Sequence, residues 1–90
     1  MTDVVNRENV RTGMKVIRGP DWNWGDQDGC SGSSGVIIGA VDSEGWVPVR
    51  WSNGSSNKYR VGANDKYDLK FSSTSNVSRN LLKCLYIVIQ

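Results

Sequence analysis

The glycines and tryptophans of this chain are confined to its middle, and this distribution restricts the fold more than any other feature. All ten glycines lie between Gly13 and Gly62, and all four tryptophans lie between Trp22 and Trp51. Glycine supplies the positive φ angles of tight turns and destabilises the interior of a helix. The middle of the chain is therefore predicted to consist of short elements that are joined by many turns.

Five segments of this region have the alternating or β-branched composition of strands. Turn residues separate them, and Asn53-Gly54 is a strong hairpin signal because both residues accept positive φ. No stretch of the region has an apolar stripe of helical period. The expected strands are residues 14–18, 35–41, 46–51, 56–60 and 67–71.

The third of these segments shows the clearest alternation. Val47, Val49 and Trp51 share one face of the expected strand. Pro48 lies on the other face, where a missing N–H is tolerated at an edge or a bulge.

Five short antiparallel strands in so few residues favour a small, strongly bent barrel, because closing the sheet removes its exposed edges. The predicted fold class is all-β: an SH3-like barrel of about five short antiparallel strands over residues 13–71. The polar residues 1–12 are expected to form a flexible N-terminal arm, and residues 72–80 a polar linker. Residues 81–90 are an apolar tail that could form a helix or a strand.

The residue types that most chemistries need are scarce. The chain has 90 residues, enough for one domain, with no histidine and two cysteines. A structural zinc site takes four cysteine or histidine ligands, and the residues after Asp21 or Asp26 lack the glycine and glutamate spacing of a calcium loop. Cys30 and Cys84 could pair, but two thiols in a reducing compartment are the simpler expectation. We expect no catalytic residues, no cofactor and no metal in this chain.

The charge and the ends of the sequence bear on partners and location. Between residues 13 and 71, basic and acidic residues are equal in number, whereas a nucleic-acid-binding domain usually carries a basic stripe. The first residues lack the basic-then-apolar pattern of a signal peptide. The apolar run at residues 81–89 is too short to span a bilayer. We expect a cytoplasmic protein with no membrane insertion, and the balanced charge argues against a nucleic-acid partner.

The loop from Gly19 to Gly29 holds the most unusual motif, in which Trp22 and Trp24 are surrounded by aspartates. One interpretation is a recognition loop, where tryptophan supplies contact area and the carboxylates supply polar specificity. The alternative is that the indoles fold back to plug the barrel, while the aspartates accept hydrogen bonds from loop amides. The residues alone leave both interpretations open.

Further candidates lie around the Asn-Gly turn. Trp51 and Tyr59 flank it and could meet as a cross-strand aromatic pair. Arg60 could bind an acidic group of a partner, or pair with an aspartate or an aromatic ring of the domain itself. The candidate partner-binding residues are Trp22, Trp24, Asp26, Asp28, Trp51, Tyr59 and Arg60. The residues expected to hold the structure are Gly19, Asp21, Gly29, Asn53, Gly54, Gly62, Asp68 and Leu69.

Five blocks of the sequence together resemble a known repeat. They are MKVIRGPDWNWGDQDG, GVIIGAV, VPVRWSNG, KYRVG and YDLK. In this order they are similar to the MIB/HERC repeat, which occurs in Mind bomb ubiquitin ligases and in certain large HECT-type ligases. The segment GPDWNWG is more similar to the Mind bomb repeats than to the HECT-type repeats.

The resemblance implies an SH3-like barrel that serves as a non-catalytic protein-interaction module in substrate recognition by E3 ubiquitin ligases. Mind bomb repeats bind short segments in the cytoplasmic tails of Notch ligands. Such segments, and other domains of an E3 ligase, are the implied partners, while ubiquitin transfer would belong to a parent protein. Two alternatives stay open: a chromatin- or nucleic-acid-binding barrel that uses its aromatic residues, and a purely architectural repeat.

Overall fold

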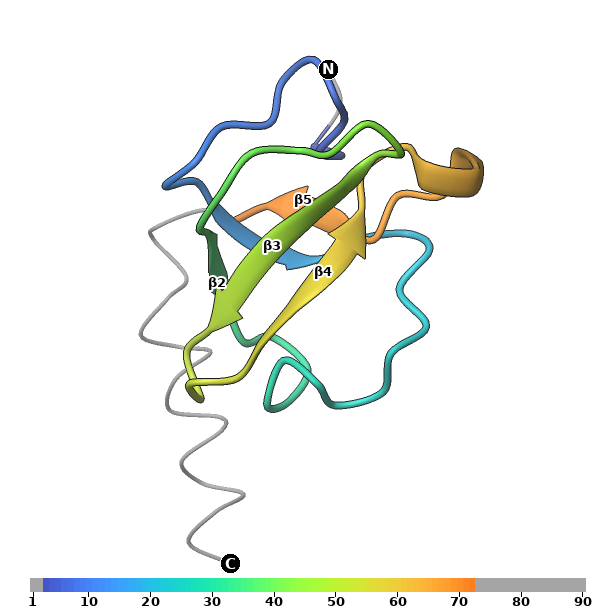
Figure 1. Ribbon diagram of the computed structural model, residues 1–90. Helices are drawn as coiled ribbons and strands as arrows, with labels where there is room; N and C mark the ends of the chain where they lie inside the picture. The colour runs from blue at the N-terminus through green and yellow to red at the C-terminus, as the bar shows by residue number, and fades with distance from the viewer. Residues whose placement is uncertain (1–2, 73–90) are drawn as a thin grey trace, which may run out of the picture.

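The computed structural model describes residues 3–72, and these form one five-stranded antiparallel sheet of order β4-β3-β2-β1-β5 (Figure 1). A single turn of 3-10 helix, η1, lies between the last two strands. The predicted all-β class with five short antiparallel strands is therefore confirmed, and its SH3-like character stays a prediction. The elements are β1 (Lys15–Arg18), β2 (Gly35–Ile37), β3 (Trp46–Trp51), β4 (Ser56–Arg60), η1 (Ala63–Asp65) and β5 (Leu69–Phe71).

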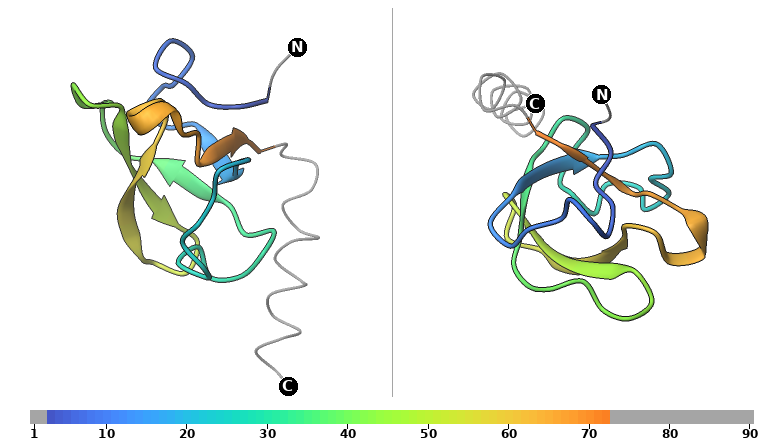
Figure 2. Two further views of the ribbon diagram at one scale, coloured as in Figure 1. Left: turned by 90° about the vertical axis from the view of Figure 1, so that its right-hand side faces the viewer. Right: turned by 90° about the horizontal axis from the view of Figure 1, so that it is seen from above.

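The sheet is strongly bent, and its two edge strands approach each other at one end (Figure 2). Val61, just after β4, forms an isolated antiparallel bridge with Tyr67, just before β5. The Asp68 N–H also donates to the Arg60 carbonyl at 2.8 Å. The bend encloses the core. It also brings the end of β4 and the residues just before β5 beside the loop that contains Trp22 and Trp24.

The core follows from the alternation of side chains along the strands. Val47, Val49 and Trp51 all point inward from β3, as the sequence predicts, and each is at most 2% exposed. Every other strand contributes at least one buried residue to the same cluster. The remaining members are Val5, Val10, Val16, Ile37, Tyr59, Val61 and Leu69.

Residues 3–12 differ from the flexible arm that we expected. Val5 is fully buried, and its N–H donates to the Leu69 carbonyl at 3.0 Å. Val4 forms a bridge with Lys70 of β5, so the segment covers the outer edge of that strand. The prediction failed because the segment is polar overall, although two of its apolar side chains, Val5 and Val10, are buried in the core.

β2 is shorter than predicted, and this explains the position of Pro48. β2 ends at Ile37, so Pro48 lies in an inner strand but at the point where the ladder to β2 finishes. Its carbonyl still accepts a hydrogen bond from Ile38 at 3.0 Å. The missing proline N–H is thus tolerated at the end of a ladder, rather than at the edge or bulge that we expected.

The Asn53-Gly54 turn also differs in detail from the prediction. Only Gly54 has a positive φ, of 93°, among these two residues. The Trp51 N–H bonds to the Ser55 carbonyl at 2.8 Å, and Asn53 Oδ1 accepts from the Ser55 N–H at 3.0 Å. The hairpin therefore has a three-residue loop with glycine in the left-handed position.

Within residues 3–72, no helix is long and apolar enough to cross a membrane. In the same part of the chain, no group of three or more acidic, cysteine or histidine side chains is placed to hold a metal ion. Cys30 is disulfide-bonded, so our expectation of a free thiol is wrong for this residue. The expected linker and apolar tail, with Cys84, lie outside the described residues, apart from Ser72.

Candidate functional site

The tryptophan loop, which we define as residues 19–29, folds back onto the core. The loop begins in close contact with the backbone of β5. Only glycine fits at position 19, because a Cβ there would lie 2.5 Å from the Leu69 nitrogen. Trp22 and Trp24 are half-buried and pack against the core cluster. In Figure 1 the loop runs as the cyan and teal segment beside β4. The two indoles therefore cover the open side of the sheet, and part of each stays exposed.

Five aromatic rings meet under this loop, and we call them the aromatic cluster. Trp22 stacks on Tyr59, with ring centroids 5.2 Å apart, and meets the edge of Trp51 at 5.5 Å. Trp24 contacts Tyr59 and Trp46, each at 6.5 Å. Trp51 and Tyr59 meet at 5.5 Å, as the sequence predicts. Such contacts between rings stabilise beyond the area that they bury, so they add to the packing of the loop against the core.

A chain of hydrogen bonds links the cluster to the side chain of Gln27 in the loop. Trp51 Nε1 donates to the Tyr59 hydroxyl at 2.9 Å, and this hydroxyl donates to Gln27 Oε1 at 2.7 Å. Burial raises the pKa of Tyr59, because a phenolate in this position would lose its hydration. The hydroxyl therefore joins the buried Trp51 indole to Gln27 of the loop.

Arg18 anchors one side of the loop. Its guanidinium donates from Nε and Nη2 to the two oxygens of Asp28, at 2.6 and 2.8 Å. Asp28 is fully buried, whereas Asp26, which accepts a third bond from Arg18 at 2.9 Å, is 79% exposed. The same guanidinium lies over Trp22, 5.4 Å from its ring centre. Hydrogen bonding by Asp28 raises the pKa of Arg18, so the cation is permanent.

Arg60 anchors the other side in the same way. It donates from Nε and Nη2 to Asp68 at 3.0 and 2.9 Å, and lies 5.1 Å from the ring centre of Trp24. Asp21 completes this side, because its carboxylate accepts the Tyr67 N–H at 2.7 Å and its carbonyl accepts from Arg60 at 3.3 Å. Of the two roles considered for Arg60, the structure places it in the internal one.

A small hollow of about 110 Å³ separates the tryptophan loop from the start of β4. Gln27 forms one wall, and its carbonyl accepts a bond from Ser55 Oγ at 2.8 Å. Ser56 and Asn57 form the other wall and are exposed. Polar backbone and amide groups therefore face solvent directly beside the aromatic cluster.

The seven predicted binding residues divide by exposure. Trp51, Tyr59 and Asp28 are at most 2% exposed and offer no surface to a partner. Asp26 is exposed, and Trp22, Trp24 and Arg60 are half-buried. The eight residues expected to be structural lie at turns, close approaches or buried bonds. Among these, Asp68 and Leu69 are fully buried, and Gly29, Gly54 and Gly62 all have positive φ.

Three residues of the site were not predicted. Arg18, Gln27 and Trp46 contact the loop or its rings. Gln27 lies in the motif between two aspartates, which was a usable signal. Arg18 is the last residue of β1, and its neighbours in the sequence do not indicate that it binds the buried Asp28.

Comparison with known proteins identifies the family. The Mib_herc2 family model matches residues 13–73. The E3 ubiquitin-protein ligase HERC2 of Homo sapiens is 48% identical over 63 residues, which is 70% of this chain and 1% of that protein. The E3 ubiquitin-protein ligase Ufd4 of Drosophila melanogaster is 45% identical over 71 residues, or 79% of this chain and 2% of that protein.

The E3 ubiquitin-protein ligase MIB2 of Gallus gallus is 48% identical over 66 residues, or 64% of this chain and 7% of that protein. MIB2 and human HERC2 have the same percentage identity to this chain, so identity does not favour the Mind bomb form. The chain spans only a small fraction of each of these relatives. Because the family model covers well over half of the chain, the chain belongs to the Mib_herc2 family.

Proposed function

We propose that this domain is a non-catalytic protein-interaction module of an E3 ubiquitin ligase that binds short segments of substrate proteins. The relatives described above are named as E3 ubiquitin-protein ligases, and the chain corresponds to at most 7% of their lengths. A domain of this size, without histidine, suits recognition better than ubiquitin transfer.

The observation that carries the proposal is a loop that packs against the core beside an open sheet edge. β4 lies at one edge of the sheet, and its first residues are exposed. The Lys58 N–H bonds only to the side chain of Asn57, at 2.9 Å, within the described chain. An extended peptide that displaces this side chain would add a strand to β4. Its side chains would then reach the hollow at Gln27 and the exposed part of Trp24.

The resemblance to Mind bomb repeats supplies the first partner to test. It implies segments from the cytoplasmic tails of Notch ligands, and the domain would then act in the cytoplasm together with other domains of the ligase. The polar edge of β4 suits such an extended segment, because main-chain bonds supply affinity and neighbouring pockets supply specificity.

The aromatic cluster is less suited to the chromatin or nucleic-acid alternative. A methyl-lysine cage and a base-stacking site both need free aromatic faces. Here Arg18 and Arg60 already lie over Trp22 and Trp24. Both guanidiniums are also bonded to buried aspartates, so neither is free for a phosphate.

The test is an amide-resolved NMR titration of the full chain with peptides from the cytoplasmic tails of Notch ligands. We expect shifts at Gln27, Ser56 and Asn57 and at the indole of Trp24. Lys58→Pro removes the outward N–H, at an edge position that tolerates proline, and should abolish binding. Lys58→Ala keeps this N–H and should preserve most of it.

Each other outcome rejects a stated part of the proposal. A well-dispersed spectrum that no peptide shifts would reject the Notch-ligand segments and favour the architectural alternative. Equal affinity of the proline and alanine variants would reject strand addition. Binding of an oligonucleotide at the same amides, with the steep salt dependence of phosphate contacts, would favour the nucleic-acid alternative.

A further inference from the structure

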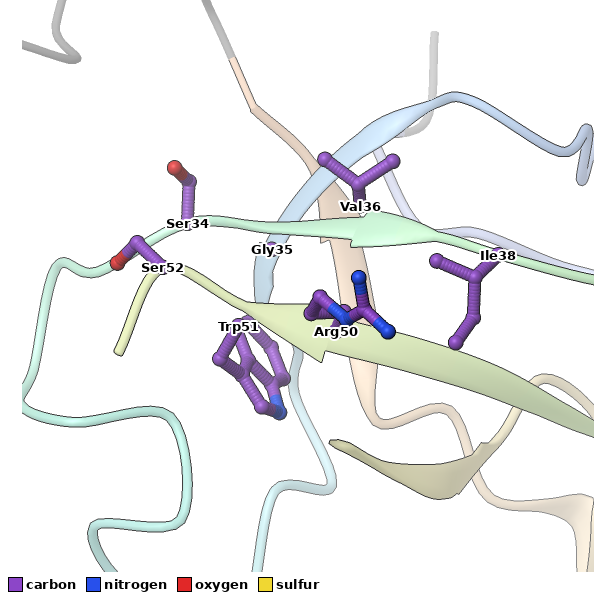
Figure 3. Close-up of a pocket in the computed structure, with 7 residues that line it drawn as sticks. All are labelled: Ser34, Gly35, Val36, Ile38, Arg50, Trp51 and Ser52. Carbon is purple, nitrogen blue, oxygen red and sulfur yellow. The ribbon is translucent and has the colours of Figure 1, made fainter. Parts of the chain in front are cut away.

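The outer face of the sheet carries apolar side chains on β2 and directly after it. Val36 is 38% exposed and Ile38 is 44% exposed. Together with Ser34, Arg50 and Ser52 they line a groove of about 360 Å³ (Figure 3). Figure 3 also shows Ile38 and Arg50 side by side, whereas Trp51 points to the other side of the sheet. Gly35 and Trp51, the latter from the aromatic cluster, also line this groove, whereas no residue of the tryptophan loop does.

The pairing of the strands places cations around these apolar residues. Val36 pairs with Lys15 of β1 on one side and with Arg50 of β3 on the other. Pro48, on the same face as Arg50, pairs with Lys58 of β4. Directly opposite residues are close neighbours on one face of a sheet. The face is thus apolar at its centre and basic along its sides, and we call it the apolar-basic face.

The cations of this face have few internal partners. Within residues 3–72, the side chains of Lys15 and Arg50 form no ion pair and no hydrogen bond. Lys58 lies 3.8 Å from Asp42 and is 62% exposed. Arg18 and Arg60, in contrast, are each bound to a fully buried aspartate. The charges of the apolar-basic face are therefore available to an external carboxylate.

We propose that the apolar-basic face binds an acidic segment of a partner protein, with apolar side chains in the groove and carboxylates on Arg50 and Lys15. The inference rests on the proposed function in that both describe a protein-binding module. It assigns a second surface, on the outside of the sheet and away from the tryptophan loop. The complementarity of charge identifies the occupant.

Charge disfavours two other occupants, and the aliphatic centre of the face disfavours a third. Residues 73–90 contain Arg79 and Lys83 and no aspartate or glutamate, so they would bring like charges to the face. A second copy that docked by the same face would also bring its own cations there. The central residues are aliphatic, so they give nucleic-acid bases no aromatic ring on which to stack.

The test is a titration of the full chain with a synthetic peptide in which glutamate alternates with leucine. Its control peptide has glutamine in place of each glutamate. We expect amide shifts at residues 34–38 and 48–52 with the glutamate peptide and much weaker binding of the glutamine peptide. Ile38→Ser should weaken binding about tenfold, because it removes an apolar contact.

Two variants that change the charge equally test whether the site is specific. Arg50→Gln should weaken binding about fivefold, as expected for an ion pair at the surface. Lys66→Gln removes one cation from an exposed turn outside the face, and it should leave affinity unchanged. Equal loss in both variants would overturn the proposal in favour of unspecific attraction.

Further outcomes identify a wrong occupant. An oligonucleotide that shifts the same amides more strongly than the glutamate peptide would overturn the choice of a protein partner. Shifts at Val36 and Ile38 that depend on protein concentration, with no peptide present, would show a second copy. Nuclear Overhauser contacts from residues 81–90 to the Val36 and Ile38 methyl groups would show that the chain's own tail is the occupant.

The two proposals can fail separately. Notch-ligand peptides that shift Gln27 and Asn57, with no effect of the glutamate peptide anywhere, would leave the proposed function and overturn this inference. Shifts confined to residues 34–38 and 48–52 would support this inference and reject strand addition at β4.

Discussion

Asp68 accepts three hydrogen bonds from Arg60, and this pair ties the end of β4 to the start of β5. The donors are the backbone N–H at 2.8 Å, Nε at 3.0 Å and Nη2 at 2.9 Å. Asp68 is fully buried, and the Arg60 side chain is 14% exposed. An ion pair in such a position stabilises little relative to an apolar pair, but the loss of one partner is costly.

Replacement of Asp68 by alanine is therefore expected to destabilise the domain by about 3–5 kcal/mol, because it leaves a buried cation without a partner. Urea unfolding of the full chain measures this change. The double variant Arg60→Ala with Asp68→Ala should lose less than the sum of the two single variants. A single-variant loss below about 1 kcal/mol, the value for a surface pair, would contradict this view of the pair.

Asp28 and Asp26 provide a matched comparison around Arg18, because both carboxylates bond to the same guanidinium. Asp28→Asn should cost about 3 kcal/mol, since the aspartate is fully buried. Asp26→Asn should cost less than about 1 kcal/mol, because this residue is 79% exposed. Thermal or urea unfolding of both variants tests the difference, and equal losses would show that burial does not set the strength of these bonds.

Gly19 and Gly25 of the tryptophan loop are expected to resist substitution for different reasons. At Gly19 a side chain would clash with its surroundings, and at Gly25 the backbone has a positive φ. A Cβ on Gly19 would lie 2.5 Å from a backbone nitrogen of β5, so Gly19→Ala should cost about 3 kcal/mol. Gly25 has a φ of 58° with open space around it, so Gly25→Ala should cost about 1 kcal/mol. The midpoints of urea unfolding measure both. A smaller loss at Gly19 than at Gly25 would mean that β5 can move away from the loop.

Removal of the Tyr59 hydroxyl should cost about 1–3 kcal/mol, because Trp51 Nε1 is buried and loses its acceptor. The measurement is urea unfolding of Tyr59→Phe near neutral pH. Tyr67→Phe is the control, because within residues 3–72 its hydroxyl takes part in no hydrogen bond. Equal stability of Tyr59→Phe and the unchanged chain would show that the Trp51 indole finds another acceptor.

The raised pKa of Tyr59 also predicts a loss of stability at alkaline pH. Burial disfavours the phenolate in the folded state, so the unfolded chain releases this proton first, at an ordinary pKa of about 10. Stability should therefore fall as the pH rises from about 10 toward the higher folded-state pKa. The unfolding free energy measured from pH 8 to 11 tests this, and the slope should be smaller in Tyr59→Phe. If the unfolding free energy of Tyr59→Phe falls with pH at the same slope, the loss of stability at alkaline pH comes from other titrating groups.

The strands could be predicted from sequence because their signals are local. Val47, Val49 and Trp51 alternate with polar residues or proline, and this pattern alone places them on one face. The role of Val5 could not be predicted in this way, because Val4, Val5 and Val10 lie in a polar segment and follow no strand or helix period. Its burial depends on the outer edge of β5, which is distant in sequence and becomes a neighbour only in the folded chain.

The site shows the same limit. The motif around Trp22 and Trp24 marks the loop correctly, but a tryptophan in a sequence does not reveal which side of its ring meets solvent. Trp51 and Tyr59 were candidates for binding for their chemistry, yet the bend of the sheet buries them. Arg18 and Arg60 look alike in sequence to Arg50. Only the positions of Asp28 and Asp68 in space distinguish Arg18 and Arg60, which bind these aspartates, from Arg50, whose side chain forms no ion pair within residues 3–72.

The pairing of residues 3–5 with β5 has a consequence for the way the domain can be joined to other chains. The Phe71 N–H donates to the Asp3 carbonyl at 2.8 Å, and the Val5 N–H donates to Leu69. The first and last parts of the described chain, at Asp3 and Phe71, therefore lie side by side. A unit of this kind can be inserted into a surface loop of a large protein without separating the flanks of that loop.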